Sequence, residues 1–276
     1  MAAPYFPPVL VAAVFGRLLK PLLTMPLTLI TGASSGIGQA CARKFAQAGH
    51  RLILNARSVE KLEALKQELE RDFSTDVLLL PFDVRDRARV EEAIRTLPAA
   101  YRDIDVLINN AGLALGTDKE HECDLEDAFT MIDTNIKALL MMTRLIVPGM
   151  VERGCGHIIN IGSVAGDVAY PGGSTYCATK AAVKALSDGL RMDLYQTPIR
   201  VTNLKPGLVE TNFSNVRLHG DTAAAKRLYT GIKPLTGDDI ADVALYAASA
   251  PPHVQIAEVL ILATHQASAQ LIYRTP

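Results

Sequence analysis

Tyr176 and Lys180 are the two residues whose types and spacing most directly suggest chemistry. They lie four positions apart in a segment with a helical pattern, so their side chains project from one face of a helix. A free phenol has a pKa near ~10 and exchanges protons poorly at neutral pH, but a neighbouring ammonium group favours the phenolate. The pair is therefore a candidate proton donor and acceptor for a reacting oxygen atom. Because this spacing also occurs by chance on ordinary helices, the pair alone is weak evidence.

Ser163 supplies a second hydroxyl group for the same chemistry. It follows an apolar run at 158–161 that is typical of a strand, and Tyr176 stands near the start of the next predicted helix. Both residues therefore lie near the carboxyl ends of central strands, where doubly wound sheets bind ligands. Their hydroxyl groups can hydrogen-bond a single substrate oxygen, which predicts proton transfer to a carbonyl or from an alcohol.

A glycine-rich loop, with the sequence TGASSGIG at 31–38, separates the first predicted strand from the first predicted helix. Glycine allows a tight turn and a close approach of the backbone to a pyrophosphate. The helix N-terminus adds free N–H groups and a positive dipole end. This context favours a dinucleotide site over a plain glycine turn. The residues expected to contact the cofactor are Gly32, Ser34, Ser35, Gly36, Ile37 and Gly38.

The second predicted strand ends in the sequence LNAR at 54–57. It lacks the acidic residue that usually binds the ribose 2′-hydroxyl group of NAD. Arg57 can instead pair with a 2′-phosphate group through charge-assisted hydrogen bonds, and Asn55 can add another hydrogen bond. The sequence therefore favours NADP(H) as the cofactor. The alternative is that Arg57 is an ordinary surface arginine at the start of a helix.

Short apolar runs and helical patterns alternate along the chain from residue 27 onward. The apolar runs are nearly continuous, which is typical of parallel strands buried on both faces of a sheet. We therefore predict an α/β fold: a single doubly wound (Rossmann) domain over 26–276, with about seven parallel strands and helices on both faces. The predicted strands are 27–30, 51–54, 77–80, 105–109, 157–161, 200–204 and 259–261, and the predicted helices are 37–48, 58–71, 86–97, 125–147, 175–195 and 238–249.

Two segments do not fit this alternation. The long connection 211–237 is expected to be irregular and to serve as a substrate lid. Residues 1–25 are expected to form an extension outside the fold. Its apolar part, 9–23, contains Arg17 and Lys20 and is too short and too charged for a stable membrane span. The alternative is an amphipathic segment that lies on a membrane or on a partner subunit.

Composition excludes several classes of partner. The formal net charge is −1 and tryptophan is absent, so we expect no nucleic-acid binding. The cysteines show no Cys-x-x-Cys pair and no histidine at metal-ligand spacing, so we expect no metal site. We predict free thiols in a reducing compartment and hence a cytoplasmic protein. The four cysteines are Cys41, Cys123, Cys155 and Cys177, of which Cys177 is next to Tyr176 and is expected to be a small packing residue.

Taken together, these motifs resemble the short-chain dehydrogenase/reductase family. The resemblance covers 27–262 and rests on motifs in the family's order: TGASSGIG at 31–38, NNAG at 109–112, Asn135, Ser163, Tyr176 with Lys180, and Pro206 with Gly207. It implies an NADP(H)-dependent oxidoreductase that moves a hydride between the cofactor and a carbonyl or alcohol. Tyr176 would be the acid/base, Ser163 would stabilise the oxyanion, and Lys180 would lower the tyrosine pKa and hold the nicotinamide ribose.

The resemblance implies roles for further residues. Asn135 would hold a water molecule that links Lys180 to solvent. Additional contacts to the cofactor would come from Asp83, Val84, Asn110, Ala111, Gly112, Pro206, Gly207, Val209 and Thr211. Family members are commonly homotetramers or dimers that pack through the long fourth and fifth helices and the last strand. The apolar segment 254–271 is consistent with such a contact.

Four further runs resemble bacterial NADP-dependent 3-hydroxy acid and serine dehydrogenases within the family. They are DIDVLINNAGLA at 103–114, YPGG at 170–173, PGLVETNF at 206–213 and PLTGDDI at 234–240, whereas Ser174 and Thr175 depart from the pattern. The resemblance implies a small carboxylate-bearing hydroxy or oxo substrate. Arg217 is the candidate partner for the carboxylate, and the alternative is a solvated lid residue or a subunit contact.

Three other functions remain as alternatives at this stage. A ketoreductase of the same fold could act on bulkier substrates such as 3-oxoacyl thioesters or steroids. A non-catalytic NADP-sensing protein is expected to lack Tyr176, Lys180 or Ser163, whereas all three are present. A membrane-tethered form would use residues 9–23.

Overall fold

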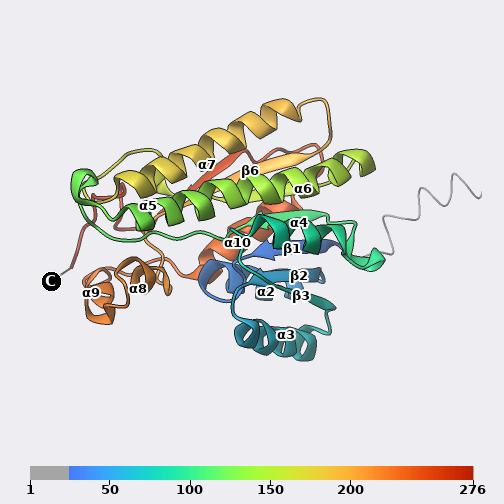
Figure 1. Cartoon of the computed structure of the whole chain (residues 1–276), viewed down its shortest axis with the longest axis horizontal. Coiled ribbons are helices and arrows are strands. Elements are labelled where there is room, and N and C mark those ends of the chain that lie inside the picture. Colours follow the sequence, from blue (N-terminus) through green and yellow to red (C-terminus); the bar gives the residue numbers. More distant parts are fainter. Residues whose placement is uncertain (1–24, 276) are drawn as a thin grey trace, which may run out of the picture.

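The computed structural model describes residues 25–275, which form a layered α/β fold (Figure 1). The first 24 residues, and with them almost all of the predicted extension, lie outside the described residues. One sheet holds seven strands in the order β3-β2-β1-β4-β5-β6-β7, and every pairing is parallel. The strands are β1 (Leu27–Thr31), β2 (Arg51–Ala56), β3 (Val77–Pro81), β4 (Val106–Asn109), β5 (His157–Ile161), β6 (Arg200–Pro206) and β7 (Glu258–Ile261).

The strand order explains where a ligand can bind. The chain winds outward from β1 to β3, returns to β4 beside β1, and then winds outward to β7. The loops after β1 and β4 therefore diverge to opposite faces, and the crevice between them lies at the carboxyl ends of the strands. The central strands β1, β4 and β5 are buried along their whole length, which confirms the predicted parallel sheet covered on both faces.

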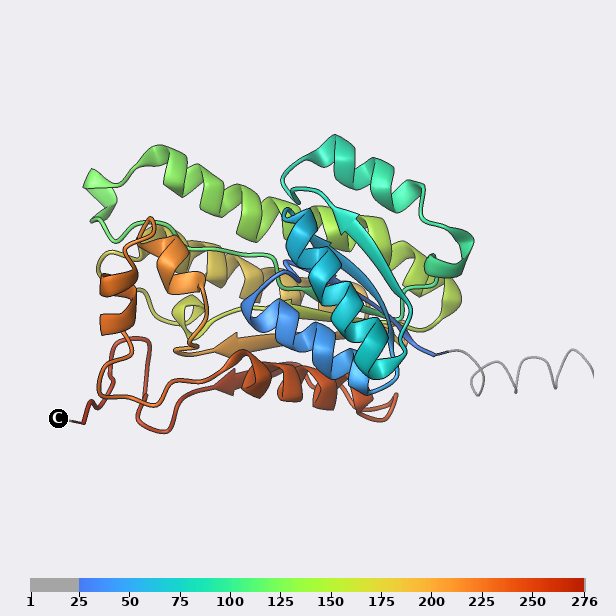
Figure 2. The same ribbon diagram turned by 90° about the horizontal axis from the view of Figure 1, so that it is seen from below.

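Two layers of helices cover the sheet. One layer holds α2 (Gly36–Gln47), α3 (Val59–Phe73) and α10 (Gly237–Ser249), which stand in front of the sheet in Figure 2. The other holds α4 (Arg87–Arg95), α6 (Ala138–Arg153) and α7 (Ser174–Asp193), which lie above the sheet in Figure 1. A hydrophobic core fills each interface. The predicted doubly wound sheet of seven strands is confirmed.

Helix α3 shows how the sequence specifies one of these helices. Ser58 is its N-cap, and the Ser58 hydroxyl accepts a hydrogen bond from the Lys61 amide at 3.4 Å. Leu62, Leu65 and Leu69 are spaced by three and four residues and are fully buried against the sheet. The helix predicted over 58–71 is confirmed.

The helix predicted over 125–147 is interrupted and longer than expected. Helix α5 (Leu125–Ile132) continues through a π-helical turn (Asp133–Lys137) into α6, and the predicted end at Pro148 is wrong. Proline removes one backbone N–H group, but packing of the fully buried Met150 against the sheet keeps the helix intact. The helix ends at Gly154, which takes the left-handed conformation (φ 69°) that glycine tolerates.

The predicted irregular connection 211–237 contains two short helices, so the expectation of an irregular segment is corrected. They are α8 (Phe213–Arg217) and α9 (Thr222–Arg227), and both lie beyond the carboxyl ends of the strands (Figure 1). The chain terminus packs against them, since the Arg274 guanidinium donates to the carbonyls of Leu228 (3.0 Å) and Thr230 (2.6 Å). Within residues 25–275, no helix combines the length and apolar character needed to cross a membrane.

Two buried histidines make the fold sensitive to acid. Burial lowers the pKa of His157 to about 3 and that of His50 to about 4. The folded state therefore holds both side chains neutral, whereas the unfolded chain protonates them below a pH of about 6.5. Stability is complete above that pH and falls as the pH drops toward the folded pKa values.

We therefore expect the free energy of unfolding to fall between pH 7.5 and pH 5, by on the order of 2 kcal/mol for His157 alone. Urea unfolding at the two pH values measures this loss. His157→Gln keeps a hydrogen-bonding partner for Thr202 and removes the titration, so it should lose less stability than the wild type. An equal loss in both proteins would contradict the assignment.

Candidate active site

Tyr176 lies in the first turn of α7 and is buried, with 8% of its surface exposed. Burial raises the pKa of the Tyr176 phenol well above its ordinary value, while the Ser163 hydroxyl and the Arg217 charge lower it. The net direction is opposite to the lowering that the sequence predicts, because loss of water is the largest effect on this phenol. The protein's own groups therefore leave Tyr176 protonated near neutral pH.

Ser163 follows β5 and begins a short 3₁₀ turn (Val164–Gly166). Its hydroxyl oxygen accepts a hydrogen bond from the Ala165 amide at 3.1 Å, which fixes the side chain at the end of the strand. The same hydroxyl lies close enough to Tyr176 to lower the phenol's pKa. The structure thus brings together the two hydroxyl groups that the sequence predicts will share one substrate oxygen.

Lys180 lies one turn after Tyr176 on α7, with its Nζ atom 5.9 Å from the centroid of the Tyr176 ring. The Lys180 ammonium donates a hydrogen bond to the carbonyl of Ile161 at 2.8 Å, which ties α7 to the end of β5. Burial lowers the pKa of Lys180 to about 8, so the amine is still mostly charged at neutral pH.

Asn135 lies in the π-helical turn and is buried. Its amide group forms a pair of hydrogen bonds with the backbone of Leu113, at 2.9 Å and 2.8 Å, and donates to the Thr179 hydroxyl at 3.0 Å. A β-carbon at Gly112 would lie 3.2 Å from Asn135 Oδ1 and 3.5 Å from Lys180 Nζ, so these two groups approach each other across a glycine. π-turns recur at functional positions because they redirect one side chain out of the helical register.

The glycine loop has the shape that a dinucleotide requires. Gly32 (φ 66°) and Gly36 (φ 54°) take left-handed conformations that other residues avoid. A β-carbon at Gly38 would lie 2.4 Å from the Gly32 carbonyl, so α2 can pack this closely only through glycine. Ser35 is the N-cap of α2, and its side chain caps no backbone amide, which leaves the first amides of α2 as donors for a phosphate.

Asn110 connects the end of β4 to this loop. Its side-chain amide donates to the carbonyls of Thr31 (2.9 Å) and Gly32 (3.1 Å). The Thr31 hydroxyl in turn accepts the backbone amides of Asn110 and Ala111, both at 3.0 Å. These bonds fix the crevice between the diverging loops after β1 and β4. Val84 and Ala111 line a small cavity on the same side of this crevice.

Arg57 is exposed where β2 ends, and it forms no ion pair within residues 25–275. Its positive charge lowers the pKa of Asp83, which follows β3 and pairs with Arg85 at 2.7 Å. Asn55 is fully buried; its amide nitrogen donates to the carbonyls of Leu80 and Phe82, and its Oδ1 atom has no protein partner. Arg57 is thus a free cation at the position predicted to meet a 2′-phosphate group.

The segment after β6 runs back toward the glycine loop. A β-carbon at Gly207 would lie 2.2 Å from Gln266 Oε1, so the chain is tightly packed here. Val209 forms an isolated β-bridge with Leu235. The Thr211 side chain packs against Gly36, since a β-carbon at Gly36 would lie only 3.1 Å from it. Pro206, Gly207, Val209 and Thr211 therefore border the crevice on the side that leads from Ser163 to α2.

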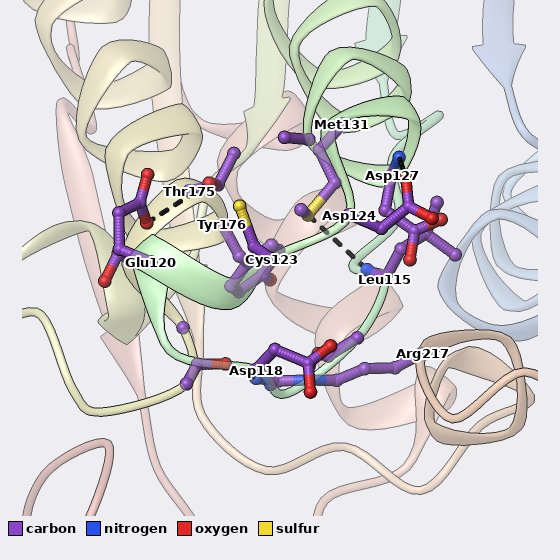
Figure 3. Close-up of a pocket in the computed structure, with 15 residues that line it drawn as sticks. Leu115, Asp118, Glu120, Cys123, Asp124, Asp127, Met131, Thr175, Tyr176 and Arg217 are labelled. Carbon is purple, nitrogen blue, oxygen red and sulfur yellow. Dashed lines mark hydrogen bonds between the residues drawn. The ribbon is translucent and has the colours of Figure 1, made fainter.

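A cleft lined by Tyr176 opens at the carboxyl ends of the strands (Figure 3). Its walls come from the segment after β4, helix α5, the start of α7 and the end of α8. The lining residues include Leu115, Asp118, Glu120, Cys123, Asp124, Asp127, Met131, Thr175, Tyr176 and Arg217.

Among the described residues that line this cleft, Arg217 is the only lysine or arginine, and three acceptors hold it in place. The guanidinium donates to the carbonyl of Gly116 (3.3 Å), the hydroxyl of Tyr170 (2.9 Å) and the carbonyl of Gly172 (3.0 Å). These bonds use three of the five N–H groups of an arginine. Within residues 25–275 the side chain pairs with no carboxylate, although several acidic residues line the same cleft.

Several residues of the site were not predicted from the sequence. Thr179 links Asn135 to the backbone carbonyl of Tyr176, to which its hydroxyl donates at 2.7 Å. Tyr170 and Gly116 hold Arg217. None of them has a residue type or spacing that signals these contacts, because each partner lies far away along the chain. The run YPGG, which contains Tyr170, was the one available signal.

Comparison with known proteins agrees with this geometry. Residues 26–221 match the family model described as short chain dehydrogenase. This chain belongs to the short-chain dehydrogenase family. The NADP-dependent 3-hydroxy acid dehydrogenase of Salmonella typhi is 49% identical over 246 residues, which cover 89% of this chain and 98% of that protein. Sulfoacetaldehyde reductase 2 of Chromohalobacter salexigens is 45% identical, over 87% of this chain and 95% of that protein.

Solved structures give the same result. The closed form of serine dehydrogenase in complex with NADP+ superposes with a TM-score of 0.84 at 44% identity, and the match covers 91% of this chain and all of that one. The chain is therefore an NADP-dependent oxidoreductase with the Rossmann-like fold of its family, as the sequence predicts.

The close packing at Gly38 gives a prediction about the cofactor loop. Gly38→Ala forces a β-carbon against the Gly32 carbonyl, so we expect a loss of about 1–3 kcal/mol in unfolding free energy and weaker NADP+ binding. Thermal unfolding and a fluorescence titration with NADPH measure the two effects. Gly189→Ala is the matched control, because a β-carbon on that helical glycine meets nothing within 4 Å. Equal behaviour of the two variants would refute the packing argument.

Proposed function

We propose that this enzyme interconverts small 3-hydroxy acids and the corresponding 3-oxo compounds, with Arg217 as the partner of the substrate's anionic group. The observation that carries the proposal is a guanidinium without a carboxylate partner that lines the same cleft as the Tyr176 phenol. Two of its N–H groups remain beyond the three that bind Gly116, Tyr170 and Gly172. A planar guanidinium recognises carboxylates through paired hydrogen bonds.

The names of the relatives support an anionic substrate. A 3-hydroxy acid and serine each carry a carboxylate, and sulfoacetaldehyde carries a sulfonate, in every case within a few bonds of the reacting carbon. A single cation beside the acid/base would serve all three substrates.

The residues of the crevice fit NADP(H). The amides at the start of α2, with Gly32, Gly36 and Gly38, would hold the diphosphate, and Arg57 would pair with the 2′-phosphate group. Asn55, Asp83 and Val84 would border the adenosine, and the other predicted contacts, Ser34, Ser35, Ile37, Asn110, Ala111, Gly112, Pro206, Gly207, Val209 and Thr211, would line the path to the nicotinamide. When bound, NADP(H) donates or accepts the hydride.

The chain's own residues handle the proton. In the reductive direction, Tyr176 donates its phenolic proton to the carbonyl oxygen, and in the oxidative direction it takes the proton from the alcohol. Ser163 orients the same oxygen with its hydroxyl group. Lys180 stabilises the tyrosinate by its charge and would hold the nicotinamide ribose. Asn135, fixed by Leu113 and Thr179, would position a water molecule through which Lys180 exchanges protons with solvent.

We also propose that the protein is a cytoplasmic homodimer or homotetramer. Exposed apolar side chains on α5 to α7 and on β7 support self-association, among them Leu125, Phe129, Leu140, Met192 and Leu260. Free thiols support a reducing compartment. We infer that residues 26–276 form the catalytic domain and that 211–237 is its lid.

Removal of the Arg57 charge should weaken NADPH more than NADH. We expect Arg57→Ala to raise the KM for NADPH about 10- to 100-fold, the effect of losing charge-assisted hydrogen bonds, and to leave the KM for NADH nearly unchanged. Arg89→Ala, at another exposed arginine, is the matched control. Wild-type enzyme that uses NADH as well as NADPH would argue against the 2′-phosphate contact.

Removal of the Arg217 charge should affect binding of the acid more than turnover. We expect Arg217→Gln to raise the KM for 3-hydroxybutyrate about tenfold or more and to change the KM for its methyl ester little. Tyr176→Phe is the catalytic control, since it should lower kcat about 10²-fold or more for both substrates. If Arg217→Gln left the KM for the acid unchanged, Arg217 would not be the anion partner.

A further inference from the structure

Helix α8 places two of its side chains against the catalytic phenol. Phe213 and Arg217 are four residues apart and so share one face of this short helix. The Phe213 ring meets the Tyr176 ring edge-on, with centroids 5.7 Å apart and planes at 60°. The Arg217 guanidinium carbon lies 5.9 Å from the centroid of the same ring. The segment predicted as a lid therefore completes the surroundings of the acid/base.

The two contacts act on Tyr176 in opposite directions. Phe213 helps to exclude water from the phenol, which disfavours its charged form. Arg217 brings a positive charge, which favours the phenolate. A hydrophobic cover without a cation would exclude water from the phenol and make the phenol hard to ionise. Because Arg217 shares a helix face with Phe213, its charge offsets part of this effect.

Arg217 is also held firmly enough for its charge to act from a fixed place. The guanidinium is bonded to Gly116, Tyr170 and Gly172, and it stacks over the Tyr170 ring at 5.5 Å. The Arg217 carbonyl accepts the Gly116 amide at 2.9 Å, so backbone and side chain both connect α8 to the segment after β4. Figure 3 shows the side chain entering the cleft from α8 below Tyr176.

We propose that Arg217, which α8 places beside the Tyr176 ring, tunes the acid/base strength of Tyr176 and so promotes the proton transfer. This role is separate from anion binding: it rests on the family's reaction and would hold for a substrate that carries no charge. In this role Arg217 acts on the reaction only through Tyr176, because its charge favours the phenolate form. It is therefore a positioning residue.

Other groups that face the Tyr176 ring also influence the pKa of its phenol, and a substitution of Arg217 leaves these groups unchanged. The Ser163 hydroxyl lies close to the phenol, the Lys180 ammonium lies 5.9 Å from the ring centroid, and Tyr170 and Cys177 lie nearby. The acidic side chains of Asp118, Glu120, Asp124 and Asp127 line the same cleft. Arg217 is the one cation among them that comes from the 211–237 segment.

The test is the pH dependence of alcohol oxidation, which needs the phenolate. With the methyl ester of 3-hydroxybutyrate as substrate, we expect Arg217→Gln to move the acid limb of kcat/KM to higher pH by about 0.5 to 2 units. That range corresponds to a unit charge near 5.9 Å in effective dielectric constants of about 80 to 20. Arg217→Lys keeps the charge and should shift the limb by less than half as much. A primary deuterium isotope effect on the hydride-donating carbon checks that chemistry limits the rate.

A second measurement needs no turnover. Ultraviolet titration of the phenolate in the NADP+ complex, with the Tyr176→Phe spectrum subtracted, should show the same shift, and Arg217→Met provides a second neutral variant. An acid limb that stays in place while kcat falls at every pH would overturn the proposal, because it would mean that α8 merely closes the cleft. Equal shifts in Arg217→Gln and Arg217→Lys would overturn it as well. Neither outcome depends on the KM for the carboxylate substrate, so failure of the anion-binding proposal is separately visible.

Discussion

The cost of burying an ionisable phenol is the constraint on which the rest of this site depends. In the proposed oxidative direction Tyr176 must already be a phenolate to accept the proton of the alcohol, yet burial, the largest effect on this phenol, raises its pKa. The Ser163 hydroxyl and the Arg217 charge offset part of that cost, and the Lys180 ammonium lies 5.9 Å from the ring centroid. A dry site strengthens these interactions because little water screens them.

The fold meets this constraint by fixing most of the compensating groups at strand ends. Ser163 follows β5, and Lys180 is tied to the last residue of β5 through the Ile161 carbonyl. Asn135 is tied to the segment after β4 through Leu113. Because β4 and β5 are adjacent and parallel, their carboxyl ends lie at one edge of the sheet, and these hydrogen bonds hold the side chains there. The glycine loop after β1 is joined to the same edge through Asn110.

The sequence was sufficient to predict the parts of the site that rest on local patterns. Continuous apolar runs predicted the parallel sheet, and the four-residue spacing of Tyr176 and Lys180 predicted that the two side chains share one face of a helix. The π-turn around Asn135 could not be predicted, because its cause is packing of the helix against α7 and not a local residue preference. The helix predicted to end at residue 147 continues past Pro148 for the same reason, because the buried Met150 packs against the sheet.

Helix α8 marks the limit of what sequence patterns reveal. Five residues are too few for a helical periodicity to be recognised, and such a helix is marginal without tertiary contacts. Its stability comes from the Arg217 bonds to Gly116, Tyr170 and Gly172, whose positions are 45 to 101 residues away along the chain. The contacts that form α8 are therefore also the contacts that place a cation over Tyr176. The folding of this short helix and the position of the Arg217 charge beside Tyr176 therefore depend on the same long-range hydrogen bonds.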